Sequence, residues 1–586
     1  MRKKNNRFSN PRMRTELFEL GPLHNLRELL ERSVNLYKGS IIITEKRKDI
    51  VMSYSMLKLK EDVEALGTAL LNLDLSGRQV AIVGENSYAW VVAYLAVVCS
   101  GLVAVPMDKE LPDDGIAGLT EKADSRAIIY SNTFTSCAKK IKKSCKSIEA
   151  CIGMYDSLNE SGCYSMNELI TSGKRKLRMK DTKYQDVKID PEEMSEIIFT
   201  SGTTGANKGV MLSQKNVCAV VNALIQVTPI EPVTFSVLPI SHTYEKNCNI
   251  LGAIYLGGKI CFNDSLKYLL SNMDLFKPSM SCMVPLFLET LHKNIWQTAE
   301  KTGLEKHLRW GVKISSFLRN FGIDLRKVFF APVLMAFGGN FRFIVCGGAP
   351  LRPEILKGLN EVGIEVANGY GITECAPLVT LNIKTRKDPE SIGTPVPGVS
   401  VKIGEKDADG NGEILVKGDN VMLGYYKDLK STRESFDDEG WFRTGDIGCI
   451  DKKGRLFING RLKNLIILDN GKNVHPEEVE TVILDHVPYI KEVVVHASEK
   501  TKEDQKQQLI AAEVYVDPEF AENMEDIDLN KLLAQDIKRV NKRLPAYKQI
   551  HYIGISREEF QKTTSKKIQR FKVLESTNTT QELKVI

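Results

Sequence analysis

Short apolar strands alternate with apolar helices over much of this chain, and this alternation restricts its fold more than any other feature. Over residues 53–73, leucines and a valine recur at three- and four-residue intervals, which predicts a helix that packs on one face. A compact β-branched strand follows at 79–83, an apolar helix at 90–98 and a further strand at 103–106. Strands and helices in this order predict a largely parallel sheet covered by helices. The same style continues over residues 200–381, so we expect an α/β fold.

The style of the sequence changes twice toward the C-terminus. A Pro- and Gly-containing loop at 393–398 precedes short alternating strands, which predict a β-rich subdomain over about 390–460. After residues 460–464, strands and helices alternate again, and the roughly 120 residues that follow are enough for a separate α+β domain. The last residues, 576–586, are polar, and we expect them to form a frayed tail.

Charge and hydropathy exclude several classes of protein. The net charge of +6 is a weak excess for 586 residues, so we expect no nucleic-acid partner. Basic runs at 139–146, 174–183 and 562–572 are expected to be solvated faces, with contact to an anionic membrane surface as the alternative. No run reaches the ~18 apolar residues that span a bilayer, and the N-terminus shows no apolar signal-peptide core. We therefore expect a cytoplasmic protein, either free or peripherally attached to a membrane.

The twelve cysteines include no Cys-x-x-Cys pair, which argues against a zinc site. Several, such as Cys99 and Cys346, stand in apolar strings where cysteine acts as a small buried hydrophobe. This pattern is typical of proteins in a reducing compartment.

Residues 197–210 predict a strand that enters an anion-binding loop. Ile197, Ile198 and Phe199 form the strand, and residues 200–209 then bring together hydroxyls, glycines and one lysine. Glycine lets backbone N–H groups converge on an anion, and Ser and Thr hydroxyls and the lysine add donors and charge. The Gly-x4-Gly-Lys-Ser/Thr spacing of a Walker A loop is absent. We expect a polyphosphate site, with a flexible polar loop as the alternative.

Three further motifs follow this loop in a fixed order. They are Asn-Gly-Tyr-Gly-Ile-Thr-Glu at 368–374, Trp-Phe-Arg-Thr-Gly-Asp at 441–446 and Lys-Thr-Thr-Ser-Lys-Lys-Ile-Gln-Arg at 562–570. Together with the loop at 200–209, they resemble the adenylate-forming (AMP-binding) superfamily of acyl-CoA synthetases, adenylation domains and luciferases. The resemblance covers about residues 25–575.

Three other segments are similar to the long-chain fatty acyl-CoA synthetase branch of that superfamily. They are Leu-Pro-Ile-Ser-His-Thr-Tyr-Glu at 238–245, Phe-Ile-Val-Cys-Gly-Gly-Ala-Pro-Leu at 343–351 and the aromatic and basic segment 296–341. The resemblance implies a large N-terminal domain of stacked sheets with helices over residues 1–461 and a small mobile α+β domain over 462–586.

The resemblance also implies a ligase that needs ATP and Mg²⁺ and acts on a medium- to long-chain fatty acid. The acid attacks the α-phosphate of ATP to give an acyl-adenylate and pyrophosphate, and the thiol of CoA then takes the acyl group and releases AMP. Two alternatives stay open: transfer to the phosphopantetheine thiol of an acyl carrier protein, and a catalytically inactive nucleotide-binding module. Acyl chain length and oligomeric state are not given by the sequence.

The resemblance assigns a catalytic set of Glu374, Lys208, His242 and Lys567. Glu374 is the expected magnesium ligand, because a hard cation prefers carboxylate oxygen. His242 is placed at the carboxylate pocket, with a core histidine as the alternative. Lys567 would stabilise the charge that develops during adenylation, although it follows a second lysine, Lys566, where glycine is common in the family.

The nucleotide site is implied in the same way. Tyr370 would stack on adenine, Asp446 would accept hydrogen bonds from the ribose hydroxyls, and Arg461 would support the ribose or the phosphates. Thr200 would give magnesium a second protein oxygen, and Lys463 stands at the family's hinge. The other expected nucleotide contacts are Ser201, Gly202, Thr203, Thr204, Gly205, Lys208, Gly348, Ala349, Pro350, Asn368, Gly369, Gly371 and Thr373.

Overall fold

The computed structural model describes most of the chain in two compact units. The described residues are 17, 19–75, 77–201, 207–229, 231–407, 409–468, 472–502, 505–522, 526–556, 558–562, 568–576 and 582–585. The first unit comprises Met1–Val401, Val416–Phe442 and Gly454–Leu456. The second comprises Lys402–Leu415, Arg443–Lys453 and Phe457–Ile586. The predicted boundary after residue 461 stays a prediction.

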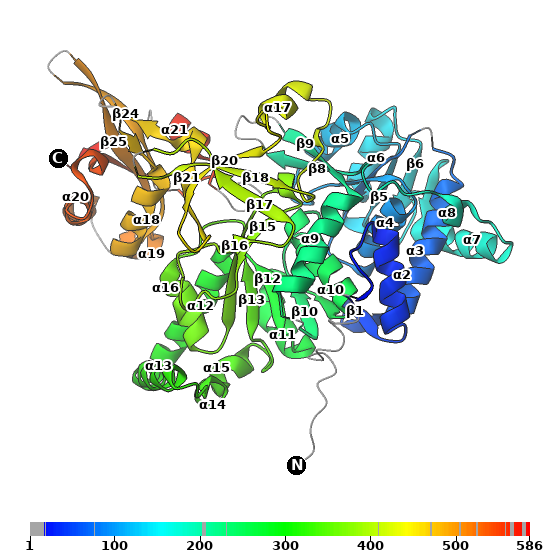
Figure 1. Ribbon diagram of the computed structural model, residues 1–586, viewed down its shortest axis with the longest axis horizontal. Helices are drawn as coiled ribbons and strands as arrows, with labels where there is room; N and C mark the ends of the chain where they lie inside the picture. The colour runs from blue at the N-terminus through cyan, green and yellow to red at the C-terminus, as the bar shows by residue number, and fades with distance from the viewer. Residues whose placement is uncertain are drawn as a thin grey trace. The chain divides into compact units, whose positions relative to one another are not determined.

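A nine-stranded sheet in the first unit has the order β16-β15-β14-β13-β12-β10-β11-β1-β2 (Figure 1). The six strands from β14 to β1 are parallel, and β2, β15 and β16 are antiparallel at the two edges. The strands are β1 (Ile41–Arg47), β2 (Ile50–Ser55), β10 (Val233–Ser236), β11 (Lys259–Phe262), β12 (Met280–Met283), β13 (Phe343–Cys346), β14 (Glu365–Gly371), β15 (Leu378–Asn382) and β16 (Thr394–Pro395).

An eight-stranded sheet in the same unit has the order β19-β9-β8-β4-β3-β5-β6-β7. The strands from β8 to β7 are parallel, whereas β9 and β19 are antiparallel at one edge. The strands are β3 (Gln79–Val83), β4 (Val103–Pro106), β5 (Ala127–Tyr130), β6 (Ala150–Gly153), β7 (Cys163–Ser165), β8 (Met194–Ser201), β9 (Asn207–Ser213) and β19 (Gly424–Tyr425). The two sheets and their helices confirm the predicted α/β fold class.

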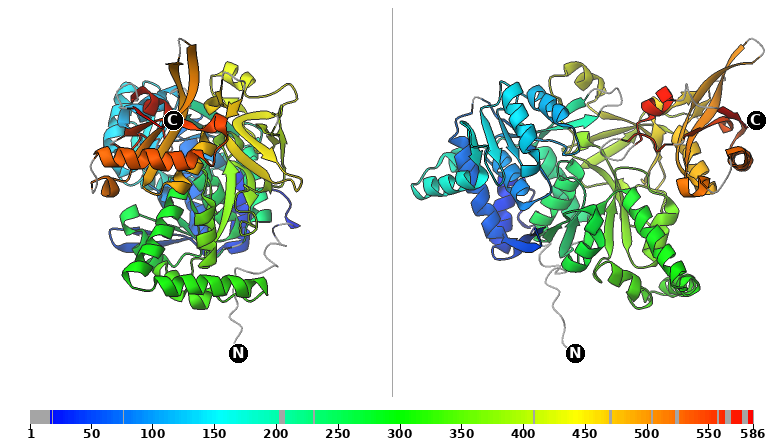
Figure 2. Two further views of the ribbon diagram at one scale, coloured as in Figure 1. Left: turned by 90° about the vertical axis from the view of Figure 1, so that its left-hand side faces the viewer. Right: turned by 180° about the vertical axis from the view of Figure 1, so that it is seen from behind.

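Helices cover both faces of the eight-stranded sheet (Figure 2). All twelve residues of α4 are buried in a core that it shares with strands of both sheets, which explains why this helix is apolar on every side. The helices up to β10 are α2 (Leu26–Tyr37), α3 (Met56–Leu71), α4 (Tyr88–Cys99), α5 (Asp113–Lys122), η1 (Asn132–Phe134), α6 (Thr135–Ser144), α7 (Met166–Arg178), α8 (Lys183–Asp186) and α9 (Gln214–Val227).

The remaining helices of the first unit include one irregular element. Residues Tyr244–Leu251 form a π-helix, η2, which no sequence pattern predicted. The others are α10 (Gly252–Leu256), η3 (Leu266–Tyr268), α11 (Leu269–Phe276), α12 (Pro285–Lys301), α13 (Glu305–Asn320), α14 (Arg326–Phe329), α15 (Ala331–Ala336), α16 (Pro353–Glu361), η4 (Thr373–Cys375) and α17 (Leu429–Glu434). Among the described residues, no helix is long and apolar enough to cross a membrane.

The second unit contains two small sheets and most of a third, β17-β18-β20-β21, whose strands also have residues in the first unit. These sheets have the orders β17-β18-β20-β21, β22-β23 and β24-β25-β26-β27. The strands are β17 (Val399–Ile403), β18 (Gly412–Gly418), β20 (Phe442–Ile450), β21 (Leu456–Arg461), β22 (Ile466–Ile467), β23 (Asn473–Val474), β24 (Ile490–Lys502), β25 (Gln505–Val516), β26 (Ile550–Ser556) and β27 (Glu582–Lys584). The helices are η5 (Leu462–Asn464), α18 (Pro476–His486), α19 (Pro518–Ala521), α20 (Asp526–Asn541), η6 (Ala546–Lys548) and α21 (Arg570–Ser576).

Two expectations from the sequence are corrected by the structure. The polar end of the chain is not frayed over residues 582–585: β27 pairs with β26, and Val585 is buried. The segment 200–209 is not one continuous loop, because Thr200 and Ser201 extend β8 and the chain returns in β9 from Asn207. The sequence did not indicate these strand residues, because their side chains are polar and show no apolar pattern. They pair through backbone N–H and C=O groups.

Candidate active site

The predicted phosphate loop begins and ends on a pair of antiparallel strands. Thr200 pairs with Lys208, and Ser201 pairs with Asn207. The predicted contacts Gly202, Thr203, Thr204 and Gly205 lie outside the described residues. The paired strands fix the backbone on which Thr200 and Lys208 stand.

Lys208 and Glu374 both contact one tyrosine, Tyr425. The Lys208 Nζ lies 4.6 Å from the centroid of the Tyr425 ring and donates a hydrogen bond to Ser431 Oγ at 2.9 Å. The Tyr425 hydroxyl donates to Glu374 Oε1 at 2.9 Å. Burial and the neighbouring Glu374 raise the pKa of Tyr425, so this hydroxyl keeps its proton. The structure therefore places a cation and a carboxylate on the same neutral tyrosine.

Tyr425 is positioned by backbone pairing with the loop-bearing hairpin. In β19 it pairs with Val210 of β9, and its N–H donates to Thr432 Oγ1 at 2.9 Å. Sequence reasoning missed this residue, because strand β19 comes more than 200 residues after its partner. The apolar run 421–426, which contains Tyr425 and lies between two polar stretches, is the signal that could have found it.

Two hydrogen bonds hold the backbone at and just after Glu374. The N–H of Met422 donates to the Glu374 carbonyl oxygen at 2.8 Å. Asn247 on η2 donates through Nδ2 to the carbonyl oxygen of Ala376 at 2.9 Å. Glu374 therefore sits on a short helical turn, η4, whose first residue is Thr373 and whose position is fixed independently of any ligand.

Glu374 fits a site for magnesium that relies on few protein ligands. Among the described residues, no cluster of three or more His, Cys, Asp or Glu side chains could hold a metal. Mg²⁺ commonly uses one or two protein carboxylates together with phosphate oxygens and water. A carboxylate can accept several partners, so the hydrogen bond from Tyr425 leaves acceptor capacity on Glu374.

Two glycine-containing segments meet at the carboxyl ends of adjacent parallel strands: residues 347–350 follow β13, and residues 369–371 end β14, where the sequence suggested a turn. Cys346 of β13 pairs with Asn368 of β14, so residues 347–350 and 369–371 emerge at the same edge of the sheet. Gly348 has φ +88°, and Gly348, Ala349 and Pro350 are exposed, whereas Asn368 and Tyr370 are buried. A Cβ on Gly371 would come 2.1 Å from the Pro377 carbonyl oxygen, and one on Gly369 would touch Leu381. Only glycine fits at Gly371, which keeps the end of β14 close to β15.

A largely apolar pocket of about 90 Å³ opens beside these segments. Strands β10, β12, β13 and β14 form one wall, and helices α9, α10 and η2 form the other. Tyr244 on η2 lines the pocket, and its hydroxyl donates to the Val345 carbonyl oxygen at 2.8 Å. The pocket also reaches Gly348, Tyr370 and Gly371 of the two segments. The remaining lining includes Leu224, Thr228, Thr234, Cys248, Asn249, Ala253, Leu256, Met280, Cys282, Cys346, Leu378 and Leu381.

His242 precedes the same π-helix. Its Nε2 lies 3.7 Å from Asp108 Oδ2, and its carbonyl oxygen accepts from the N–H of Lys246 at 3.0 Å. The predicted role of His242 at the carboxylate pocket stays a prediction.

A buried ion pair joins the π-helix to the strand that carries Thr200. The Lys246 Nζ contacts Glu196 Oε2 and lies 3.2 Å from the Tyr94 hydroxyl, which itself donates to Glu196 Oε1. All three side chains are buried, and desolvation lowers the pKa of Lys246. Sequence reasoning missed this trio, because Lys246 stands beside the polar residues Glu245 and Asn247, and Glu196 follows Ser195, so neither charge is conspicuous in the sequence.

In the second unit, two predicted ribose-binding residues contact each other. Arg461 Nε lies 2.9 Å from Asp446 Oδ1, and Asp446 is buried on β20 while Arg461 ends the adjacent strand β21. Lys463 is exposed on η5. Beside it, Asn464 Nδ2 donates to Glu477 Oε1 at 2.6 Å.

The C-terminal lysine-rich motif is described only at its two ends. Lys562 forms ion pairs with Glu492 and Glu559, and Arg570 Nη2 donates to Glu480 Oε1 at 2.6 Å. The predicted catalytic lysine, Lys567, and its neighbour Lys566 lie outside the described residues.

The fold and these motifs define an adenylate-forming enzyme, and comparison with known proteins agrees. Residues 30–426 match the family AMP-binding enzyme, and residues 463–579 match the AMP-binding enzyme C-terminal domain. Crystal structures with the same fold include the anthranilate CoA ligase AuaEII with anthranoyl-AMP (TM-score 0.74, 20% identity, 96% of this chain and 98% of that chain). ATP-bound MatB from Rhodopseudomonas palustris gives a TM-score of 0.72 at 22% identity, covering 94% of this chain and 99% of that chain.

Curated relatives identify the family. Long-chain-fatty-acid--CoA ligase 5 of Rattus norvegicus is 30% identical over 549 residues, covering 86% of this chain and 79% of that protein. Long-chain-fatty-acid--CoA ligase 1 of Cavia porcellus is 26% identical over 586 residues, covering 92% of this chain and 82% of that protein. This chain belongs to the AMP-binding enzyme family, as its motifs predicted.

Proposed function

We propose that this protein is an AMP-forming ligase that activates a medium- to long-chain fatty acid with ATP and transfers the acyl group to CoA. The observation that carries the proposal is the cluster of Lys208, Tyr425 and Glu374 beside an apolar pocket that reaches Tyr370 and Gly371. Neighbouring parts of one unit would thus bind the phosphates and the apolar acid. The names of the rat and guinea-pig relatives support the choice of acid and thiol.

In the first half-reaction, this chain's residues have to neutralise phosphate charge and orient the acid. Lys208 supplies a fixed cation next to the hairpin loop, because Ser431 and the Tyr425 ring restrain its amine. Glu374 and Thr200 would hold Mg²⁺, which would neutralise negative charge on the phosphate oxygens. The apolar pocket would hold the acyl chain, with its carboxylate toward Gly371 at the end of β14.

The roles of the other predicted residues stay part of this proposal. Tyr370 would contact adenine, Asp446 and Arg461 would contact the ribose, Lys567 would act at the α-phosphate, and Lys463 would serve as the hinge. Transfer to an acyl carrier protein, instead of CoA, is the second candidate, because both acceptors end in the same phosphopantetheine arm. Attachment of the protein to a membrane is likewise a proposal.

A single assay distinguishes these functions. Pyrophosphate release from ATP is measured with a panel of acids from acetate to oleate, and products formed with CoA or with holo-carrier protein are identified by mass spectrometry. We expect release that depends on longer acids and an acyl-CoA product. Acyl transfer only to the carrier protein would establish the second candidate, and no release with any acid would indicate an inactive nucleotide-binding module.

A further inference from the structure

Helices α13, α14 and α15 carry an unusual concentration of exposed apolar side chains. Of the 28 large hydrophobic residues that are exposed in the described chain, ten lie within residues 304–335. They are Leu304, Trp310, Ile314, Phe317, Phe321, Ile323, Leu325, Val328, Phe329 and Met335. Isolated exposed hydrophobic residues are normal, but a continuous group of this kind marks an interaction surface. We call these ten residues the apolar patch.

Helix α13 has two apolar faces, and only one of them packs on the protein. Leu308 and Val312 pack against the core of the first unit, and Ser315 is buried. Trp310, Phe317 and their neighbours Ile314 and Phe321 recur at intervals of three and four residues on the opposite face. Trp310 is 67% exposed and Phe317 is 61% exposed. Packing on the core accounts for only one of these two apolar faces.

Basic side chains border the apolar face. Residues 305–336 contain six lysines and arginines but only two acidic residues. Both acidic side chains are already paired, Glu305 with Arg309 and Asp324 with Arg326. Lys306, Lys313 and Lys327 are exposed. Their helical positions place Lys306 and Lys313 on one flank of the Trp310–Phe317 face.

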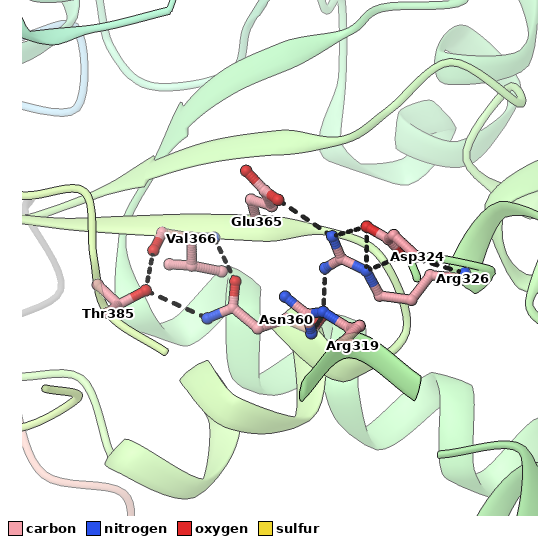
Figure 3. A network of polar contacts seen from close by, with 7 residues as sticks. All are labelled: Arg319, Asp324, Arg326, Asn360, Glu365, Val366 and Thr385. Atoms are coloured by element: carbon pink, nitrogen blue, oxygen red, sulfur yellow. Dashed lines mark hydrogen bonds and ion pairs between the residues drawn. The ribbon is translucent and has the colours of Figure 1, made fainter. Parts of the chain in front are cut away.

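The patch is fixed to the nine-stranded sheet by a polar network (Figure 3). The buried Arg326 donates to the Asn360 carbonyl oxygen at 2.7 Å and to Glu365 Oε1 at 3.1 Å. Asn360 in turn accepts from the N–H of Val366 at 3.1 Å through its side chain. Arg326 lowers the pKa of Asp324 to about 2, so this ion pair stays charged. The exposed helices are therefore a rigid platform attached where β14 begins.

The platform is part of the segment that connects two strands which line the apolar pocket. It joins β12 to β13, and Met280, Cys282, Val345 and Cys346 on these strands line the pocket. In Figure 1, α13, α14 and α15 lie together beyond the lower ends of β12 and β13. The patch thus lies beyond the ends where β13 and β14 begin, and Gly348 and Gly371 lie where these strands finish. The pocket lies beside the same strands.

We propose that the apolar patch docks the protein on an anionic lipid bilayer, with the aromatic side chains in the interface and the lysines at the headgroups. A helix with aromatic residues on one side and lysines along its border lies in a membrane surface rather than across it. A basic border fits negative headgroups, and each basic residue near such a surface contributes about 1 kcal/mol of attraction. A second copy of this chain would bring the same lysines together, which disfavours self-association. The proposal does not depend on the ligase function, because lipid binding is measured without substrates.

The test is flotation of the full-length protein with phosphatidylcholine vesicles and with vesicles that also contain phosphatidylglycerol. We expect binding to the mixed vesicles that weakens at high salt. The triple substitution Trp310→Ser, Phe317→Ser and Phe321→Ser should reduce the partition coefficient at least about tenfold. Lys306→Gln, Lys313→Gln and Lys327→Gln should reduce it by roughly fivefold per lysine on mixed vesicles only.

A matched control removes exposed apolar side chains elsewhere in the first unit. Ile50→Thr with Met179→Ser should bind as the wild type does, since both residues are exposed and lie outside the patch. Thermal unfolding of all variants should coincide, because surface substitutions leave the core intact. The proposal is overturned if the aromatic variant floats like the wild type, or if binding does not depend on phosphatidylglycerol and on salt concentration. Lipid-free sedimentation velocity that shows a dimer broken by the aromatic substitutions would instead assign the patch to a second copy.

Discussion

Replacing Lys246 with methionine leaves the Glu196 carboxylate buried without its cation. In the wild type, Lys246 and Tyr94 both contact Glu196, and all three side chains are buried. Removing one partner of a buried ion pair costs about 3–5 kcal/mol, because the remaining charge has lost its solvation and its counterion. Tyr94 keeps one hydrogen bond to the carboxylate, which does not replace the charge.

The expected change in melting temperature follows from the size of the first unit. At about 2.1 cal/mol/K per residue, a unit of roughly 430 residues unfolds with an entropy near 0.9 kcal/mol/K. A loss of about 3–5 kcal/mol therefore lowers the melting temperature of this unit by about 3–6 °C. Differential scanning calorimetry measures this shift directly.

Two further variants separate charge burial from simple loss of contacts. The double variant Lys246→Met with Glu196→Leu replaces the pair by apolar side chains, and it should regain most of the lost stability. Lys215→Met removes a surface lysine that lies 2.8 Å from Glu192 Oε1, and it should cost about 1 kcal/mol or less. If Lys246→Met melts with the wild type, or if the double variant is no better than the single one, the pair does not hold η2 to β8 as argued.

Four other predictions concern the site and its surroundings. Tyr425→Phe removes a hydrogen bond to Glu374 and should lower kcat/KM for pyrophosphate release roughly ten- to a hundredfold, with a raised Mg²⁺ requirement; unchanged kinetics would exclude the positioning role. Lys567→Ala should abolish adenylation yet spare thioesterification of supplied acyl-adenylate, and full adenylation would remove this lysine from the mechanism. Lys463→Pro should change the rate of at least one of the two half-reactions, adenylation and thioesterification. If both rates equal those of the wild type, Lys463 is not the hinge. Burial raises the pKa of Glu245 from 4.5 to about 8, so its stabilising contribution is complete below 4.5 and is lost as the pH rises to about 8. The free energy of unfolding of Glu245→Gln should therefore exceed that of the wild type by an amount that grows with pH across this window, at up to about 1.4 kcal/mol per pH unit. The difference in melting temperature between the two proteins should grow in the same way, and a constant difference would contradict the raised pKa.

Local pattern was enough for the parallel core of the fold. The strands at 79–83 and 103–106 have the predicted bounds, because buried parallel strands are continuously apolar. Helix α16 likewise follows local rules: Pro353 stands at its first turn, and Gly363 just beyond its end adopts φ +100°.

Features that depend on distant pairing could not be predicted. Tyr425 reaches Glu374 only because β19 pairs with β9, and the hydrogen bond between Lys208 and Ser431 spans 223 residues. Strand β27 looked like a tail because its pairing with β26 leaves no trace in its polar sequence. The π-helix has no periodicity of its own in the sequence, and its buried lysine became understandable only with Glu196 across from it.

The two-residue strand that carries Tyr425 has a consequence for the solubility of the protein. β19 is the last strand of the eight-stranded sheet, and so short an edge offers few free N–H and C=O groups to a passing chain. Gly424 in this strand has φ +141°, and a Cβ there would come 2.6 Å from Thr432 Cγ2. A larger residue at this glycine would loosen β19 and expose the edge of β9. Aggregation would then accompany the loss of the Glu374 contact, so a defect that looks catalytic would first be seen as low yield of folded protein.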